Sequence, residues 1–375
     1  MVENKDKKVL NVPNLRFPEF QGEWKKCKLG DVCNTSTGNK NTQDKTDDGI
    51  YPFYVRSQTV ERINSWTFDG EAILTAGDGV GVGKVFHHTY GKIGVHQRVY
   101  ILSDFKCDAN YLFHFFSSKF YNRVKRMSAK NSVDSVRKEM ITDMPLSLPC
   151  CQEQIKIGYM LSILDERIAT QNKIIEDLKK LKCAIIEKLY SEIQGKEYLY
   201  GQLFEVVNKR NKQMEYSNIL SASQEKGMVN RDDLNLDIQF ERSNINTYKI
   251  VRAGDYVIHL RSFQGGFAFS DKLGVCSPAY TILRPNCLLE YGYLSYYFTS
   301  HRFIKSLIIV TYGIRDGRSI NIEEWLNMKV IIPSKEYQLH TLKILRSIEG
   351  KIENEETYTI CLSNQKQYLL NQMFI

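Results

Sequence analysis

A glycine-rich segment is the first place in this sequence to look for phosphate or cofactor chemistry. It runs Thr75-Ala-Gly-Asp-Gly-Val-Gly-Val-Gly-Lys84. A nucleotide-binding P-loop needs G-x-x-x-x-G-K followed by Ser or Thr, but Asp78 stands where the first glycine belongs and Val85 follows the lysine. The dinucleotide-binding pattern G-x-G-x-x-G also fails at its last glycine. We therefore expect a glycine-rich turn before a strand, whose backbone can approach phosphate closely.

Other catalytic patterns are missing from the sequence. It has no Asn-Pro-Pro-aromatic motif of adenine methyltransferases, no H-E-x-x-H metal motif and no G-x-S-x-G nucleophile motif. The seven histidines are scattered and have no acidic partners at metal-ligand spacing. The sequence therefore predicts no catalytic residue, no metal site and no cofactor in this chain.

Basic and amide side chains in the expected loops, beside aromatic residues, are the types that contact DNA. Arginine can bind guanine through two hydrogen bonds, and glutamine or asparagine can bind adenine. Most such contacts go to phosphate, and for each residue the alternative is a solvated surface or a salt bridge. In the first half the candidates are Tyr54, Arg56, Gln58, Lys84, Gln97, Arg98, Lys130, Asn131 and Arg137. In the second half they are Lys209, Arg210, Gln224, Arg261, Gln264, Tyr312, Arg315 and Arg318.

Composition is consistent with such a role without requiring it. The 375 residues carry a formal net charge of +8, which fits either one or two positive faces that meet phosphate or a slightly basic protein with no nucleic-acid partner. The nine cysteines are scattered, with no C-x-x-C pair, which favours a reducing compartment. The polar amino terminus is unlike a signal peptide, and no apolar run approaches the roughly 20 residues that span a bilayer. We expect a cytoplasmic protein that does not enter a membrane.

The sequence contains one long internal repeat. Leu29-Gly-Asp-Val32 resembles Leu203-Phe-Glu-Val206, and Gly70-Glu-Ala-Ile-Leu74 resembles Gly254-Asp-Tyr-Val-Ile258. Further along, a constant offset of 184 residues relates Ser135 to Ser319, Met144 to Met328, Pro149 to Pro333, Gln154 to Gln338, Leu161 to Leu345 and Ile168 to Ile352. The copies differ most in expected loops, such as residues 34–48 and their counterpart around 208–212. A shared frame with divergent loops indicates two related domains that recognise different things, although a duplication could also serve stability alone.

Each copy changes character after its proline, at Pro149 and Pro333. Before the proline, mixed apolar and polar residues predict short strands, at residues 72–75, 95–102, 256–260, 279–283 and 329–332. After it, helix formers dominate, and Ser334 and Glu336 suit the start of a helix. A helix of about 40 residues is roughly 60 Å long and cannot bury its apolar stripe in a small domain.

The apolar positions of these helices follow a heptad pattern, which predicts a coiled-coil seam. An antiparallel pair within the chain would place the two domains at opposite ends and fix their separation; a homodimer zipper is the alternative. Lys182 and Lys366 occupy equivalent seam positions, where polar residues can fix the register. The predicted seam residues are Leu161, Leu164, Ile168, Ile175, Leu178, Ile185, Leu345, Ile348, Ile352, Leu362 and Leu369.

Two groups of residues resemble a known family. The opening Pro13-Asn-Leu-Arg-Phe-Pro-Glu-Phe20, followed by Gly22-Glu-Trp24 and Lys28-Leu-Gly-Asp-Val32, is similar to the start of type I restriction-modification specificity subunits. So are Leu148-Pro149, Glu153-Gln154-Ile155 and Leu164-Asp-Glu-Arg-Ile168. The distal copy departs at Lys335-Glu-Tyr-Gln338, where Tyr337 replaces the acid before the glutamine.

The resemblance implies an α+β fold in which two related mixed α/β target-recognition domains are separated by two long antiparallel helices that form a coiled coil. The expected ranges are 1–150 and 196–334 for the domains, and 151–195 and 335–375 for the helices. Each domain would recognise one half of a bipartite, asymmetric site in double-stranded DNA. The helices would set the spacer and dock two methyltransferase subunits that carry S-adenosylmethionine. Restriction subunits that use ATP and Mg would join the full complex, and this chain itself would be non-catalytic.

Two other functions remain open at this point. A fused restriction-methylation enzyme would need a methyltransferase motif set and more length, and the sequence has neither. A non-catalytic coiled-coil scaffold without DNA specificity would show little salt dependence in DNA binding, whereas a protein that makes several phosphate contacts loses affinity steeply as salt rises.

Overall fold

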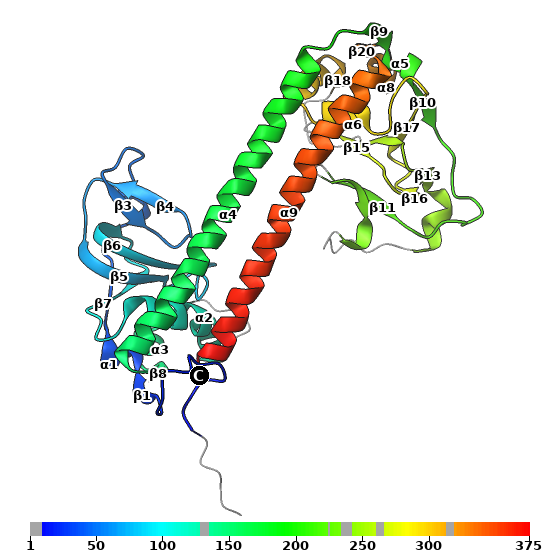
Figure 1. Ribbon diagram of the computed structural model, residues 1–375. Coiled ribbons are helices and arrows are strands. Elements are labelled where there is room, and N and C mark those ends of the chain that lie inside the picture. Colours follow the sequence, from blue (N-terminus) through cyan, green and yellow to red (C-terminus); the bar gives the residue numbers. More distant parts are fainter. Residues whose placement is uncertain (1–9, 128–134, 224–225, 234–241, 260–265, 313–318) are drawn as a thin grey trace, which may run out of the picture. The chain divides into compact units, whose positions relative to one another are not determined.

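The computed structural model describes residues 10–127, 135–223, 226–233, 242–259, 266–312 and 319–375 (Figure 1). The chain divides into two compact units. The first comprises the residues up to Asn172 together with Thr357–Ile375, and the second comprises Lys173–Glu356. The chain has two long helices, α4 (Cys151–Ser191) and α9 (Lys335–Met373). One part of each helix belongs to the first unit and the remaining part belongs to the second.

A six-stranded sheet in the order β2-β7-β5-β6-β3-β4 forms the frame of the first unit. Neighbouring strands are antiparallel except β3 and β6, which are parallel. The strands are β2 (Asn34–Thr37), β3 (Tyr51–Tyr54), β4 (Val60–Ile63), β5 (Phe68–Ala76), β6 (Phe86–Val95) and β7 (Val99–Ser103). The other elements are β1 (Lys25–Lys28), α1 (Leu29–Val32), the 3₁₀ helix η1 (Thr42–Asp44), α2 (Ala109–Met127), α3 (Lys138–Thr142) and β8 (Pro145–Leu148), and β1 pairs with β8.

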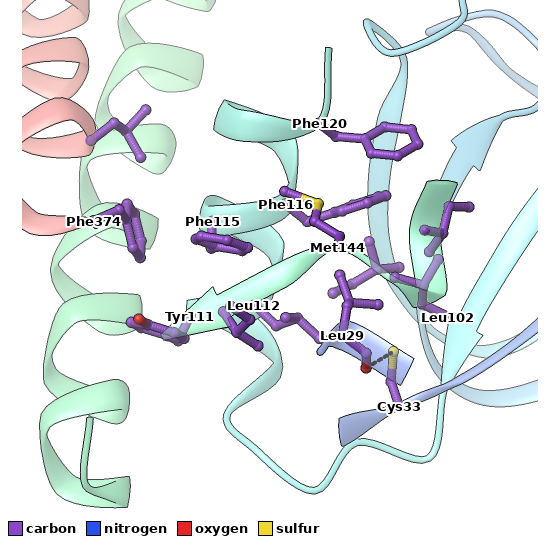
Figure 2. Packing of buried hydrophobic residues seen from close by; sticks show 14 of the residues in the cluster. Leu29, Cys33, Leu102, Tyr111, Leu112, Phe115, Phe116, Phe120, Met144 and Phe374 are labelled. Carbon is purple, nitrogen blue, oxygen red and sulfur yellow. Dashed lines mark hydrogen bonds between the residues drawn. The ribbon is translucent and has the colours of Figure 1, made fainter. Parts of the chain in front are cut away.

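Helix α2 supplies much of the core of the first unit. Its residues Leu112, Phe116 and Phe120 recur every four positions, so they lie on one face of the helix, and all three are fully buried. Figure 2 shows this row beside Leu29 of α1 and Met144. The sheet and the short elements around it therefore share one hydrophobic core with α2.

The second unit repeats this arrangement with shorter strands. Its main sheet has the order β10-β17-β14-β15, which matches β2-β7-β5-β6 in the first unit. The strands are β9 (Lys196–Leu199), β10 (Phe204–Val207), β11 (Leu220–Ser223), β12 (Gly227–Asn230), β13 (Lys249–Val251), β14 (Tyr256–Ile258), β15 (Phe267–Phe269), β16 (Gly274–Cys276), β17 (Thr281–Pro285), β18 (Thr311–Tyr312), β19 (Ser319–Ile320) and β20 (Lys329–Ile332). The helices are α5 (Tyr200–Leu203), α6 (Tyr293–Tyr297), α7 (His301–Ser306) and α8 (Ile322–Leu326), with the 3₁₀ helices η2 (Arg231–Asp233), η3 (Arg242–Thr247) and η4 (Leu307–Val310).

Equivalent glycines lie near the start of equivalent strands in the two units. Gly70 within β5 and Gly254 before β14 both have positive φ, at 138° and 97°, a backbone conformation that residues with a Cβ rarely adopt. Strands β5 and β14 then pair antiparallel with β7 and β17, respectively. The two units are thus related copies of one mixed α/β frame, as the repeat in the sequence predicted.

A buried glutamine ties each long helix to its own unit in the same way. The side-chain amide of Gln154 donates to the Pro149 carbonyl at 2.8 Å and its oxygen accepts from the Asp108 N–H at 3.0 Å. Gln338 donates to the Pro333 carbonyl at 3.1 Å and accepts from the Glu290 N–H at 2.8 Å. The two glutamines and the two prolines are each related by the offset of 184, so the repeat extends to individual hydrogen bonds.

The residue before each glutamine differs for a structural reason. Glu153 is fully buried and accepts two hydrogen bonds from the Arg16 guanidinium, both at 2.8 Å. Its counterpart Tyr337 instead donates its hydroxyl to the Leu189 carbonyl at 3.0 Å. The acid is therefore needed where the amino-terminal segment folds back on the helix, and the second copy uses a different contact.

The two long helices run antiparallel within each unit. In the second unit Lys182 pairs with Glu349 at 2.6 Å, while Lys179, earlier on α4, pairs with Glu356, later on α9, at 2.7 Å. In the first unit the end of α9 packs beside the first turns of α4, because Leu362, Leu370 and Met373 share one buried cluster with Ile157, Leu161 and Leu164.

A polar triad joins both long helices to the domain helix in each unit. In the first unit His114 of α2 lies 3.7 Å from the carboxylate of Asp165, which also pairs with Lys366. In the second unit the Tyr296 hydroxyl donates to Glu349, which pairs with Lys182. Asp165 and Glu349, like Lys182 and Lys366, are related by the offset of 184 residues. The seam lysines predicted from the sequence thus bind an acid on the opposite helix, which restricts the register of the pair.

Every predicted seam residue of the long helices is buried or half-buried. Buried are Leu161, Leu164, Ile175, Leu345, Ile352 and Leu362; half-buried are Ile168, Leu178, Ile185, Ile348 and Leu369. The structure adds Ile186, Tyr190, Leu342 and Leu370, which are buried outside the predicted heptad positions because the helices also pack against the bodies of the two units.

One strand prediction is wrong. The strand predicted over residues 95–102 is in fact the end of β6 and most of β7, separated by a turn at 96–98. The turn forms because the Val99 N–H donates to the His96 carbonyl at 2.9 Å and the Arg98 N–H donates to the His96 ring nitrogen Nδ1 at 3.0 Å. The turn exposes Gln97 and Arg98. The other predicted strands overlap β5, β14, β17 and β20, although residue 260 lies outside the described residues.

Candidate nucleic-acid interface

Loops that are far apart in the sequence meet in the first unit. A β-bridge joins Lys40 to His96, and the Gly77 N–H donates to the Arg98 carbonyl at 2.7 Å. A second bridge joins Asp78 to Ser135. We call this group the first-unit loop cluster; its segments are residues 38–41, 55–59, 77–85, 96–98 and 135–137.

Two predicted arginines of the cluster share one carboxylate. Arg56 donates from Nη1 to Asp78 at 2.9 Å, and Arg98 Nε lies 3.7 Å from the second oxygen of Asp78. Their side chains are 46% and 65% exposed, so both guanidinium groups remain accessible to solvent. The carboxylate of Asp78 thus holds both guanidinium groups and neutralises only one of their two positive charges. The surface that remains is positive and is suited to phosphate or to a guanine edge.

The turn that presents Arg98 depends on a neutral histidine. His96 is buried, and its Nδ1 accepts a hydrogen bond from the Arg98 backbone. Burial lowers the pKa of His96, and the neighbouring Arg56 lowers it further. The imidazole therefore remains an acceptor at neutral pH and keeps the turn in place.

Two further predicted residues lie at the edges of the cluster. Gln97 is exposed and donates to the Asn41 side chain at 2.6 Å, so the turn at 96–98 is attached to the loop after β2. Lys84 is exposed at the end of the glycine-rich segment, with its ammonium group 5.4 Å from the centroid of the Tyr121 ring. Each can exchange its present partner for DNA at modest cost, since both contacts are at the surface.

The remaining candidates of the first half have different surroundings. Gln58 and Arg137 are exposed within the cluster. Tyr54 is buried, with its hydroxyl donating to Thr89 at 2.8 Å and its ring against His87, so it supports the sheet beneath the cluster and offers no surface to DNA. Lys130 and Asn131 lie outside the described residues.

A polar hollow in the second unit contains the candidates that follow β10. Its volume is about 650 Å³ and its lining is Asn208, Lys209, Arg210, Asn211, Lys212, Gln213, Glu215 and Ile250. Buried Asn211 shapes the loop, because its side chain donates to the Tyr216 carbonyl at 2.7 Å. Lys209, Arg210 and Lys212 are exposed around it. This loop occupies the position of residues 38–41 in the first unit, since both follow the equivalent strand.

The other second-half candidates cannot be placed at this hollow. Tyr312 lies in β18, beside β19. Gln224, Arg261, Gln264, Arg315 and Arg318 lie outside the described residues.

Several polar residues at these surfaces were missed from the sequence. Lys40, Asp78 and His96 belong to the first-unit loop cluster. Lys212 belongs to the second-unit loop, and Lys249 of β13 forms a β-bridge to Arg210 of that loop. Asp78 could have been noticed in the sequence, because it replaces the first glycine of the P-loop pattern. Residue type alone did not point to His96, whose role follows from a turn that the strand prediction overlooked.

Across the described part of the chain, no group of three or more His, Cys, Asp or Glu side chains is arranged to hold a metal ion. Nor does any described helix have the length and apolar character needed to cross a bilayer.

Comparisons with known proteins relate the chain to one family. The family model described as type I restriction modification DNA specificity domain matches residues 21–180. The chain is 28% identical over 168 residues to the type I restriction enzyme EcoDI specificity subunit of Escherichia coli, an alignment that covers 44% of this chain and only 37% of that relative. It is 25% identical over 418 aligned positions to the MjaVIII specificity subunit of Methanocaldococcus jannaschii, covering 98% of this chain and 95% of the relative.

Solved structures share the fold. A type I restriction-modification S subunit from M. genitalium superimposes with a TM-score of 0.62 at 14% identity, covering 97% of this chain and 99% of that one. A chain from a study of complex assembly in the type I R-M system superimposes with a TM-score of 0.56 at 14% identity, covering 95% and 98%. At these identities the likeness concerns the fold.

Proposed function

We propose that this chain acts as a type I restriction-modification specificity subunit and that each of its two units recognises one half of a bipartite, asymmetric site in double-stranded DNA. The chain thereby selects the sequence on which partner subunits act and performs no chemistry itself. The observation that carries this proposal is the pairing of a shared frame with different loops. Gln154 and Gln338 attach the helices identically, whereas the exposed side chains of the equivalent loops differ.

The charges at these loops support DNA as the ligand. In the first unit they are Arg56, Arg98 and Lys84, with Gln58 and Gln97 as amide groups. In the second unit Lys209, Arg210 and Lys212 surround a polar hollow. Cations attract the phosphate backbone without regard to sequence, while arginine and amide side chains can distinguish base edges. We propose that these exposed residues contact DNA, with Arg137 at the margin of the first-unit cluster.

We further propose that residues 1–150 and 196–334 act as the two target-recognition domains and that residues 151–195 and 335–375 set the spacer between half-sites. A helix of 41 residues extends about 60 Å. The two polar triads support this role, because a shift of one helix along the other would separate Lys182 from Glu349 and Lys366 from Asp165.

The long helices also carry equivalent exposed apolar residues. Ile155 corresponds to Leu339, and Ile174 corresponds to Tyr358, by the offset of 184, and all four are exposed. A hollow of about 390 Å³ lies beside Tyr358 in the first unit, lined also by Ile163, Glu166, Arg167, Thr170 and Gln171. Since equivalent surfaces bind equivalent partners, we propose that two copies of an adenine methyltransferase subunit dock on them. Those subunits would supply S-adenosylmethionine, and restriction subunits would supply ATP and Mg chemistry.

Mapping methylated adenines in genomic DNA tests the proposal. Cells that contain the methyltransferase subunit are compared with and without this chain. We expect modified adenines within one motif that has two specified parts separated by a fixed number of unspecified bases, only when the chain is present. Methylation that is unchanged by removal of the chain would favour the scaffold alternative, and an uninterrupted motif would contradict the two-domain proposal.

A further inference from the structure

The glycine-rich segment of the first unit has a fixed backbone. The Val82 N–H donates to the Gly79 carbonyl at 3.1 Å, and the Val85 N–H donates to the Gly81 carbonyl at 2.9 Å. Gly79 has a φ of +75°, and Val82 is buried in the core. The segment is therefore a hydrogen-bonded turn anchored in the core by a side chain.

The turn also packs tightly against both arginine segments. The Gly77 N–H donates to the Arg98 carbonyl, and a Cβ added at Gly81 would lie 2.4 Å from the Arg56 carbonyl oxygen. Real Cβ atoms do not approach that closely, so only glycine fits at position 81. The tip of the turn is thus held in a defined place between Arg56 and Arg98.

One aliphatic side chain stands at this tip. Val80 follows Gly79 in the turn and is 98% exposed, while Val82 and Val85 of the same segment are buried. Because it contacts almost nothing, the isopropyl group of Val80 contributes little to folding. Arg56 lies beside this turn, since a Cβ added at Gly79 would lie 4.0 Å from its Nη1, and Arg56 and Arg98 share the carboxylate of Asp78 in the same turn.

An apolar side chain on a turn that also carries bound cations matches one partner in particular. The cations attract the DNA backbone, which brings the tip to a groove. The 5-methyl group of thymine is the apolar group that a base pair presents in the major groove, and small aliphatic side chains contact it. A preorganised turn can make this contact without a further loss of backbone entropy on binding.

We propose that Val80 contacts the 5-methyl group of a thymine in the half-site recognised by the first unit. The proposal rests on the proposed function and extends it, because it identifies a base group and a residue that distinguishes it. A half-site that contains a methylated adenine has at least one thymine on the opposite strand, so a candidate base is always present.

The test uses the complex of the full chain with its methyltransferase subunits and duplexes that carry the mapped site. Each thymine of the half-site is replaced in turn by 2′-deoxyuridine, which lacks only the methyl group. At one position the wild-type complex should lose about fourfold in affinity, the value of one buried methyl group. Val80→Ala should weaken binding to the thymine duplex and reduce the effect of deoxyuridine at that position to less than twofold.

Two control variants separate the possible outcomes. Val206→Ala, at an exposed valine of the second unit, should retain the full deoxyuridine effect. Arg56→Ala should weaken binding to all the duplexes, which shows that the cluster meets DNA. Uniform binding of wild type to every deoxyuridine duplex, or an undiminished effect in Val80→Ala, would overturn the inference while the proposed function stands. A complex that fails to prefer the mapped site over unrelated DNA would overturn both.

Discussion

Replacing Phe374 with alanine is expected to lower the free energy of unfolding of the first unit by about 3–5 kcal/mol. Phe374 follows the last turn of α9 and is only 3% exposed. Its ring centroid lies 5.2 Å from that of Tyr111 and 5.8 Å from that of Phe115, both on α2 (Figure 2). The end of α9 thus completes a core most of whose residues come from the amino-terminal half, and alanine would leave a cavity there.

Urea denaturation followed by hydrogen exchange of the α2 amides measures this effect. Tyr368→Ala is the matched control, because Tyr368 lies on the same part of α9 but is exposed. It should change stability by less than about 0.5 kcal/mol. Equal effects of the two substitutions would show that the end of the chain does not belong to the first core.

Acidification is expected to destabilise the first unit through His114. Burial lowers the pKa of His114 to about 4 from its ordinary value of 6.5, with Asp165 acting in the opposite direction and Lys366 lowering it further. Between these two pH values the unfolded chain binds a proton that the native histidine does not. Stability is therefore complete above pH 6.5 and falls as the pH approaches 4, by about 3 kcal/mol for this residue.

The contribution of His114 is isolated by comparing two proteins. Unfolding free energies of wild type and His114→Gln are measured from pH 7 to pH 4, since other groups titrate equally in both. The wild type should lose about 3 kcal/mol more than the variant. Parallel pH profiles would contradict the assignment. The second unit has Tyr296 in the equivalent place, where burial raises the pKa above its usual value, so no matching loss is expected there.

The features that could be predicted from the sequence are those that depend on regular residue spacing or on the repeat. Apolar spacing along one helix determines which face is buried, so the burial of Leu161, Ile352 and the other predicted seam residues could be expected without a structure. The offset of 184 residues revealed the duplicated frame, because equivalent residues such as Gln154 and Gln338 perform equivalent tasks. A proline before each helix indicated where α4 and α9 begin.

The features that could not be predicted depend on long-range contacts. Tyr54 has the residue type of a base-contacting side chain, but its burial follows from strands that pair far along the chain. The turn at 96–98 is set by the side chain of His96, which a strand pattern does not reveal. The pairing of Asp78 with Arg56 and Arg98 depends on three separate loops. Residues that meet between loops do not recur at a regular spacing in the sequence, and residue type alone does not show which side chains pair.

Exchanging residues 1–150 for those of a type I restriction-modification specificity subunit that recognises a different site tests most directly whether each unit recognises one half-site. The residues equivalent to Tyr111 and Phe115 are retained so that the exchanged domain still packs against Phe374. Methylated adenines are then mapped in cells that contain the chimera and the methyltransferase subunit. The account predicts that one half of the recognised motif changes while the other half is kept. A chimera that methylates DNA with both halves changed, or with neither changed, would contradict it.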